Sequence, residues 1–130
     1  MFNYWLVGAT FGDDLERDVL PEFIELGYWE MDWDDRDQPA QTDRRSQLRV
    51  GDFLAVKRLK GQGAKEMDVL AIGVITAFNA SRRVAFVKWL DTHLNHSVAL
   101  KGCVQAINGP FSYSDDADRP WIREVFGVLN

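Results

Sequence analysis

Two tryptophans in an acidic segment are the residues of this sequence best suited to hold a flat molecule. Trp29 and Trp33 lie four positions apart in the stretch GYWEMDWDDRD, residues 27–37. The carboxylates around them resist burial without partners, so we expect both indoles at a boundary between core and solvent. An indole there either packs on the domain or forms one wall of a cage. Composition alone favours packing and leaves the cage open.

The charge of the sequence is unevenly distributed. The formal net charge is -5, which argues against a sequence-indifferent coat for nucleic acid, because neutralisation of phosphates drives such binding. Residues 13–43 contain twelve acidic residues and two arginines, whereas residues 44–65 contain seven basic residues and one acid, Asp52. This asymmetry indicates a polar binding face, or two blocks that pair with each other across a solvated surface.

Few residues are spaced for catalysis or for binding a metal. His93 and His96 lie near Asp91 but lack a third strong ligand at a characteristic spacing, so we expect two ordinary turn histidines. The sequence contains no GxSxG, P-loop or dinucleotide motif. Clustered surface acids such as those of residues 33–37 are usually solvated charges. We expect a binding module with no catalytic residue, metal or cofactor.

Length and composition indicate one globular domain over residues 1–130. The apolar share of 46% and the charged share of 27% are close to globular averages. No apolar run approaches the roughly 18 residues of a membrane span, and the first residues do not resemble a signal peptide. We therefore expect a cytoplasmic protein that does not enter a membrane. The single cysteine, Cys103, lies in an apolar run and is expected to be a buried thiol.

The first part of the chain is expected to form a strand and a helix. Residues 3–10, NYWLVGAT, have strand-forming side chains on both faces, which predicts a central strand. Asp13 or Asp14 can cap a helix that ends at Gly27. Pro21 either kinks this helix or starts a second short one at residues 21–26.

The rest of the chain is predominantly β. Residues 34–47 carry turn and breaker residues and are expected to be a surface loop. Three apolar runs separated by turns predict a meander of strands, at residues 50–59, 67–78 and 82–90. A further strand at 97–107, a turn at 108–116 and a short helix at 116–129 complete the pattern. Together these elements predict an α+β fold, a small curled β-barrel with peripheral helices.

The order of four short motifs resembles the EVE-like domains of the PUA-like superfamily, and most of all those at the N-terminus of McrB-type restriction AAA+ proteins. The motifs cover about the first 90 residues: WLVGA at 5–9, a helix ending in GYWE at 27–30, a strand from VGD to a basic residue at 50–57, and IGVIT at 72–76. The sequence departs from the family in three ways. Acidic residues stand in place of a second glycine after Trp29, the expected helix contains Pro21, and the sequence lacks a nucleotide-hydrolysing domain. The last departure leaves restriction activity itself open.

The resemblance implies an aromatic pocket on a small barrel that receives a modified base flipped out of nucleic acid. A methyl or hydroxymethyl group adds contacts that an unmodified base lacks, and a basic rim offsets the cost of flipping. Modified DNA is expected more than RNA, in defence or targeting, with a nuclease or AAA+ partner. By this resemblance, Trp29 and Trp33 form stacking walls supplemented by Phe11 and Tyr28, and Thr10 or Asp34 bonds the edge of the base. The expected phosphate contacts are Arg44, Arg45, Arg49, Lys57 and Arg58.

Two other functions are compatible with the sequence. The acidic segment could dock a basic protein partner, which would make the chain a protein-interaction module. Alternatively, the domain could bind or process RNA, as some ASCH relatives do, and the acids of residues 33–37 would then be required.

Overall fold

The computed structural model describes residues 2–11, 17–32, 38–61 and 63–127, which form an α+β fold. Its strands are β1 (Tyr4–Val7), β2 (Thr10–Phe11), β3 (Arg17–Asp18), β4 (Tyr28–Glu30), β5 (Phe53–Leu59), β6 (Glu66–Phe78), β7 (Val84–Asp91), β8 (His96–Ala99) and β9 (Ile107–Phe111). Its helices are α1 (Leu20–Leu26), α2 (Pro39–Ser46) and α3 (Arg119–Val125).

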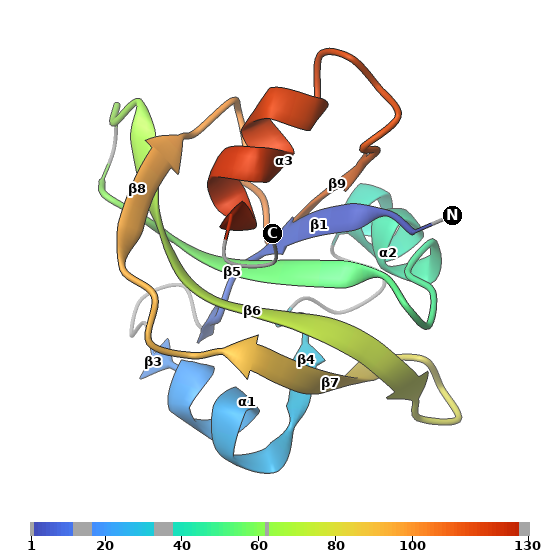
Figure 1. Ribbon diagram of the computed structural model, residues 1–130. Helices are drawn as coiled ribbons and strands as arrows, with labels where there is room; N and C mark the ends of the chain where they lie inside the picture. Colours follow the sequence, from blue (N-terminus) through green and yellow to red (C-terminus); the bar gives the residue numbers. More distant parts are fainter. Residues whose placement is uncertain (1, 12–16, 33–37, 62, 128–130) are drawn as a thin grey trace.

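One curled mixed sheet dominates the molecule, as expected for a partly closed barrel with peripheral helices (Figure 1). Its strand order is β4-β7-β6-β5-β1-β9, with β8 paired to the first part of β6. Only β1 and β5 run parallel among these pairs; the others are antiparallel, and β5, β6 and β7 form the predicted meander. Register shifts interrupt β6 where it pairs with β5 and with β7. Such bulges bend a sheet, which accounts for its curl.

Apolar side chains fill both faces of the central strands. On one face Trp5, Trp29 and Phe23 belong to the larger core cluster, inside the curl and against α1. On the other face Leu6 and Ile72 pack with the side chains of α3. Figure 1 shows α3 on one side of the sheet and α1 on the other. β1 is therefore buried on both faces, as its sequence predicts.

The start of α1 agrees with one of the two alternatives for Pro21. The helix begins at Leu20, and Pro21 lies in its first turn, where a missing N–H costs no hydrogen bond. Asp18 Oδ1 accepts a hydrogen bond from Leu20 N at 3.0 Å, while Asp13 and Asp14 lie outside the described residues. Gly27 ends the helix with φ 71°, the left-handed conformation expected of it.

Four segments differ from the sequence-based expectation. Residues 17–18, expected inside the first helix, form β3. Residues 28–30, where the sequence predicts no strand, add β4 to the edge of the sheet, beside β7. Most of the expected surface loop at 34–47 is helix α2, although residues 34–37 lie outside the described part of the chain. The expected strand at 97–107 is divided into β8 and the start of β9, with turns between them. Cys103 lies in that connection and is buried, as expected.

Within the described ranges, no helix is both long and apolar enough to cross a bilayer.

Candidate functional site: a pocket beside β5

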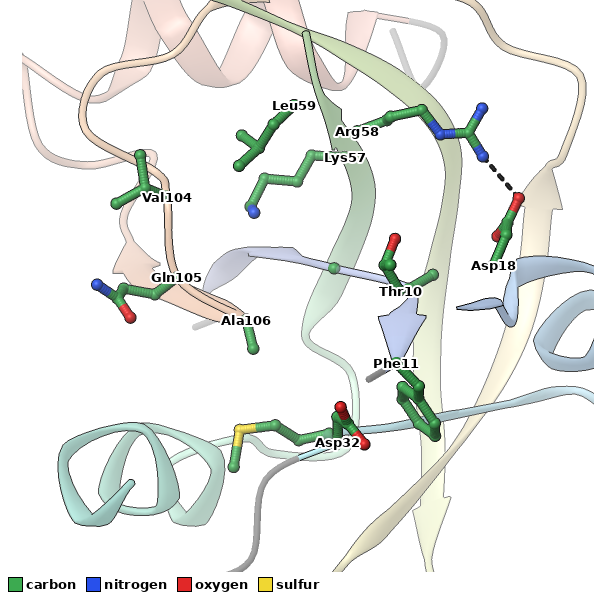
Figure 2. Close-up of a pocket in the computed structure, with 13 residues that line it drawn as sticks. Thr10, Phe11, Asp18, Asp32, Lys57, Arg58, Leu59, Val104, Gln105 and Ala106 are labelled. Atoms are coloured by element: carbon green, nitrogen blue, oxygen red, sulfur yellow. Dashed lines mark hydrogen bonds and ion pairs between the residues drawn. The ribbon is translucent and has the colours of Figure 1, made fainter. Parts of the chain in front are cut away.

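A pocket of about 610 Å³ opens beside the end of β5. Three separate parts of the chain form most of its walls: the segment from Gly8 to β2, the end of β5, and residues 104–106 before β9 (Figure 2). The lining residues are Gly8, Ala9, Thr10, Phe11, Asp18, Met31, Asp32, Lys57, Arg58, Leu59, Val104, Gln105 and Ala106. A cavity of this size is typical of sites for small molecules.

The backbone of Gly8 joins two walls of the pocket. Gly8 N donates a hydrogen bond to Ala106 O at 2.9 Å. The indole Nε1 of Trp29 donates to Gly8 O at 3.0 Å, from inside the core. Both backbone groups of Gly8 are therefore satisfied, which fixes the strip of chain that leads to Thr10 and Phe11.

Two buried amides hold the wall at residues 104–106. Gln41 of α2 accepts a hydrogen bond from Ala106 N at 2.8 Å and donates one to Gln105 Oε1 at 3.0 Å. Asn108 of β9 accepts from Gln105 N at 3.2 Å and donates to Gln105 O at 2.8 Å. A segment without regular secondary structure is thus held on both sides by side chains that are themselves buried.

Lys57 is the buried charged group of the pocket. Only 7% of the residue is exposed, and burial lowers the pKa of its ammonium from 10.5 to about 8, although the nearby Cys103 acts in the opposite direction. The β5–β6 register shifts between Val56 and Lys57. The extra residue at this shift is Leu70 of β6, and Figure 2 shows Lys57 of β5 extending into the pocket.

Arg58 and Asp18 form an ion pair at the rim. Arg58 Nη2 lies 2.7 Å from Asp18 Oδ2, and both side chains are about half exposed. Since Thr10 pairs with Asp18 in the small β2–β3 ladder, this ion pair ties the ladder to β5. Its contribution to stability is small because both groups are solvated.

Four of the eleven expected site residues line the pocket: Thr10, Phe11, Lys57 and Arg58. Phe11 supplies an aromatic ring, which packs edge-on against the buried Phe23 with 5.9 Å between ring centroids. Lys57 was expected to contact phosphates on an outer rim, but its burial places it inside the pocket instead.

The aromatic residues of the acidic segment do not form the expected cage in the described part of the chain. Trp29 is fully buried, with 0% of its surface exposed, so it supports the pocket from behind and cannot stack on a ligand. Tyr28 is partly buried beside Phe23, with 4.9 Å between ring centroids, and does not line the pocket. Trp33 and Asp34 lie outside the described residues.

The other three expected phosphate contacts lie away from the pocket lining. Arg44 and Arg45 are in the last turn of α2, and Arg49 is in the turn before β5. Arg45 is only 7% exposed, so this conformation does not present it to a phosphate. Arg44 is half-buried and Arg49 is exposed. The basic stretch at 44–65 is therefore not one continuous face of pocket residues.

The remaining pocket residues carry little signal in the sequence. Met31 and Asp32 stand in the acidic segment with no distinguishing pattern, and the apolar run at 97–107 predicts a strand at residues 104–106. Asp32 has a partial sequence signal, because it lies two residues after the GYWE motif, and it provides a carboxylate at the level of Phe11 (Figure 2). The 104–106 wall had no sequence signal, since hydrogen bonds to Gln41 and Asn108 define it.

The histidines and acids do not assemble into a metal site within the described residues, where no three metal-ligating side chains come together. His96 Nε2 donates a hydrogen bond to Glu124 O at 3.1 Å, and His93 Nδ1 lies 3.3 Å from Thr92 Oγ1. Nothing in the described part of the chain positively indicates catalysis. The pocket offers one ring, one thioether, two cations and two carboxylates, which suit a flat, polar ligand.

Comparison with known proteins finds no protein-family model that matches this sequence and no curated protein with significant similarity to it.

Proposed function

We propose that this chain is a non-catalytic EVE-like module that binds nucleic acid and reads a methylated or hydroxymethylated base flipped into the pocket. DNA is the preferred nucleic acid, in the context of defence or targeting. The observation that supports this most is the convergence of Thr10, Phe11, Lys57 and Arg58 on one pocket. They come from two segments far apart in the sequence, and they represent both expected sets, base-binding and phosphate-binding.

In this proposal each pocket residue has a distinct role. Phe11 stacks on the flipped base, and its own contact with Phe23 keeps the ring in place. Asp32 takes the role first expected of Asp34: its carboxylate accepts a hydrogen bond from an exocyclic amine, as on cytosine or adenine. Arg58, exposed at the rim, contacts a phosphate next to the flipped nucleotide.

Binding of modified oligonucleotides tests the proposal directly. Fluorescence anisotropy would compare duplexes that carry one 5-methylcytosine, 5-hydroxymethylcytosine or N6-methyladenine with the unmodified duplex, at fixed salt. We expect about tenfold tighter binding for one of the modified duplexes, which corresponds to about 1.4 kcal/mol. Equal affinity for all four duplexes would overturn the proposal.

Substitution of Phe11 separates pocket binding from surface binding. Phe11→Ala should weaken binding of the preferred duplex by about tenfold or more, because a base–aromatic stack contributes about 1–3 kcal/mol. Phe86→Ala is the matched control: Phe86 is an exposed phenylalanine on β7, outside the pocket lining, and its loss should leave affinity unchanged. If both variants behave alike, nucleic acid does not enter this pocket.

A further inference from the structure

The ammonium group of Lys57 lacks a counter-charge. Nζ has no hydrogen bond or ion pair among the described residues, although only 7% of the residue is exposed, on the side of the open pocket. Figure 2 shows it directed into the space between Leu59 and residues 104–106, where the neighbouring side chains of Leu59 and Val104 are aliphatic. A largely buried cation without a partner is unfavourable, so proteins ordinarily pair such a group or keep it exposed to solvent.

The other charged groups near Lys57 do not supply the missing partner. Asp18 is bound to Arg58 at 2.7 Å, and Figure 2 shows Asp32 on the opposite side of the pocket, beside Phe11. The Cys103 thiol stays protonated near neutral pH, because burial raises its pKa further than Lys57 and Lys101 lower it. The described chain thus leaves a cation facing an open cavity.

We propose that Lys57 forms an anion-binding subsite, so that the ligand of this pocket carries a carboxylate or a phosphate-type group beside its flat part. The anion of the ligand provides the counter-charge that the protein lacks, while Phe11 contacts the flat part on the other side of the pocket. The inference does not depend on nucleic-acid binding. If a flipped base does enter, its anionic group is either an acidic substituent of the ring or the phosphate of the same nucleotide.

Two simple anions test the subsite and distinguish the two sources of negative charge. Sulfate represents the tetrahedral phosphate type and keeps its charge across the pH range used, and benzoate represents a carboxylate on a flat ring. Each is titrated in chloride-free buffer while the backbone amide NMR signals of Thr10, Gln105 and Ala106 are followed. We expect saturable shifts with at least one anion in the wild-type protein, and the tighter anion identifies the class.

Two variants assign the effect to Lys57. Lys57→Met keeps the length of the side chain but removes the charge, and should abolish the saturable shifts. Lys60→Met is the matched control, because Lys60 lies three residues along the chain, bonds Asp68 at 3.1 Å and does not line the pocket. It should leave the titration unchanged. Shifts that persist in Lys57→Met would assign anion binding to Arg58 and overturn the inference.

A pH series provides a second readout. Because the pKa of Lys57 in the empty pocket is about 8, the affinity for sulfate should fall by about tenfold or more between about pH 7 and about pH 9.5. Absence of saturable shifts with both anions, or an affinity independent of pH, would overturn the inference. Failure of the oligonucleotide experiment above would leave it standing, since neither anion is a nucleic acid.

Discussion

At the scale of single residues, buried polar groups determine both the pocket and the stability of the strands around it. Lys57 and Asp52 lie five positions apart on the β5 segment and are almost equally buried. They differ in their partners: Asp52 accepts three hydrogen bonds, whereas Lys57 has none in the described chain. A satisfied buried group stabilises the fold and an unsatisfied one destabilises it, so opposite effects of substitution are expected.

Removal of the Lys57 charge should make the protein more stable. Its pKa is about 8 in the folded state, against 10.5 for an unperturbed lysine, so the unfolded chain binds the proton more tightly. The difference corresponds to a destabilisation of the folded state by roughly 3 kcal/mol. This destabilisation is present in full below about pH 8 and is lost as the pH rises towards 10.5. Lys57→Met should therefore raise the free energy of unfolding at neutral pH by about 1–3 kcal/mol.

Urea denaturation of both proteins across this pH range checks the prediction. The wild-type protein should gain stability relative to Lys57→Met from about pH 8 to about pH 10.5, and the difference should then vanish. Lys60→Met again serves as control, since an exposed cation with one surface ion pair changes stability by less than about 1 kcal/mol. A less stable Lys57→Met protein at neutral pH would contradict the argument.

Stability should be especially sensitive to substitution of Asp52. One carboxylate oxygen accepts from Asn3 N at 3.0 Å, and the other accepts from Trp5 Nε1 at 3.0 Å and Arg49 N at 3.1 Å. Asp52→Asn turns one acceptor into an N–H₂ group that faces a donor, which should cost about 2–4 kcal/mol of unfolding free energy. Asp116→Asn, at a side chain 94% exposed, should cost less than about 0.5 kcal/mol in the same urea titration.

At the scale of elements, helix α2 has a positioning role that its polar sequence conceals. It buries only Gln41 and Arg45, so it has no apolar face of the usual kind. Its contribution to the pocket is made by Gln41, which bonds both Gln105 and Ala106. The helix therefore holds the 104–106 wall through hydrogen bonds more than through apolar burial.

Substitution of Gln41 should loosen that wall while the sheet remains folded. Gln41→Ala leaves Ala106 N without its acceptor, at an expected cost of about 1–3 kcal/mol. Amide hydrogen exchange at Ala106 should become faster by about tenfold or more, while exchange in β5 and β6 changes little. Gln47→Ala is the control: Gln47 caps α2 and its amide bonds only the exposed Asp43, so exchange at Ala106 should not change. Equal protection of the Ala106 amide against exchange in both variants would show that other contacts hold the 104–106 wall.

At the scale of the whole molecule, curvature of the sheet brings the pocket together. β1 and β5 lie side by side and in parallel, so the segment after β1 and the last residues of β5 meet at the same edge of the sheet. Register shifts between β5 and β6 before Lys57, and between β6 and β7 at Ile72/Gly73 and Ile75/Ala77, bend the sheet. Gly73 lies at one of them, where a Cβ would come within 2.5 Å of Val87 Cγ1.

The regular elements with strong local patterns were predictable from the sequence. The meander β5–β7 follows from apolar, β-branched runs separated by turns, and Gly27 ends α1 because it adopts a positive φ. Elements without such patterns were not. α2 lacks apolar periodicity, although Pro39 in its first turn and Arg44 near its end are helix signals. β4 lacks a strand pattern because acidic residues surround it and only one of its side chains, Trp29, is fully buried.

The amino-acid sequence by itself determined the α+β class, the central position of β1, the meander, and the presence of aromatic and basic side chains. Local backbone preference and apolar patterning determine these features. Only the tertiary structure decided which of those residues share a pocket. It buries Trp29, brings Thr10, Phe11, Lys57 and Arg58 together, and leaves Lys57 without a counter-charge in the described chain. Burial and pairing depend on contacts between distant segments, which no local pattern records.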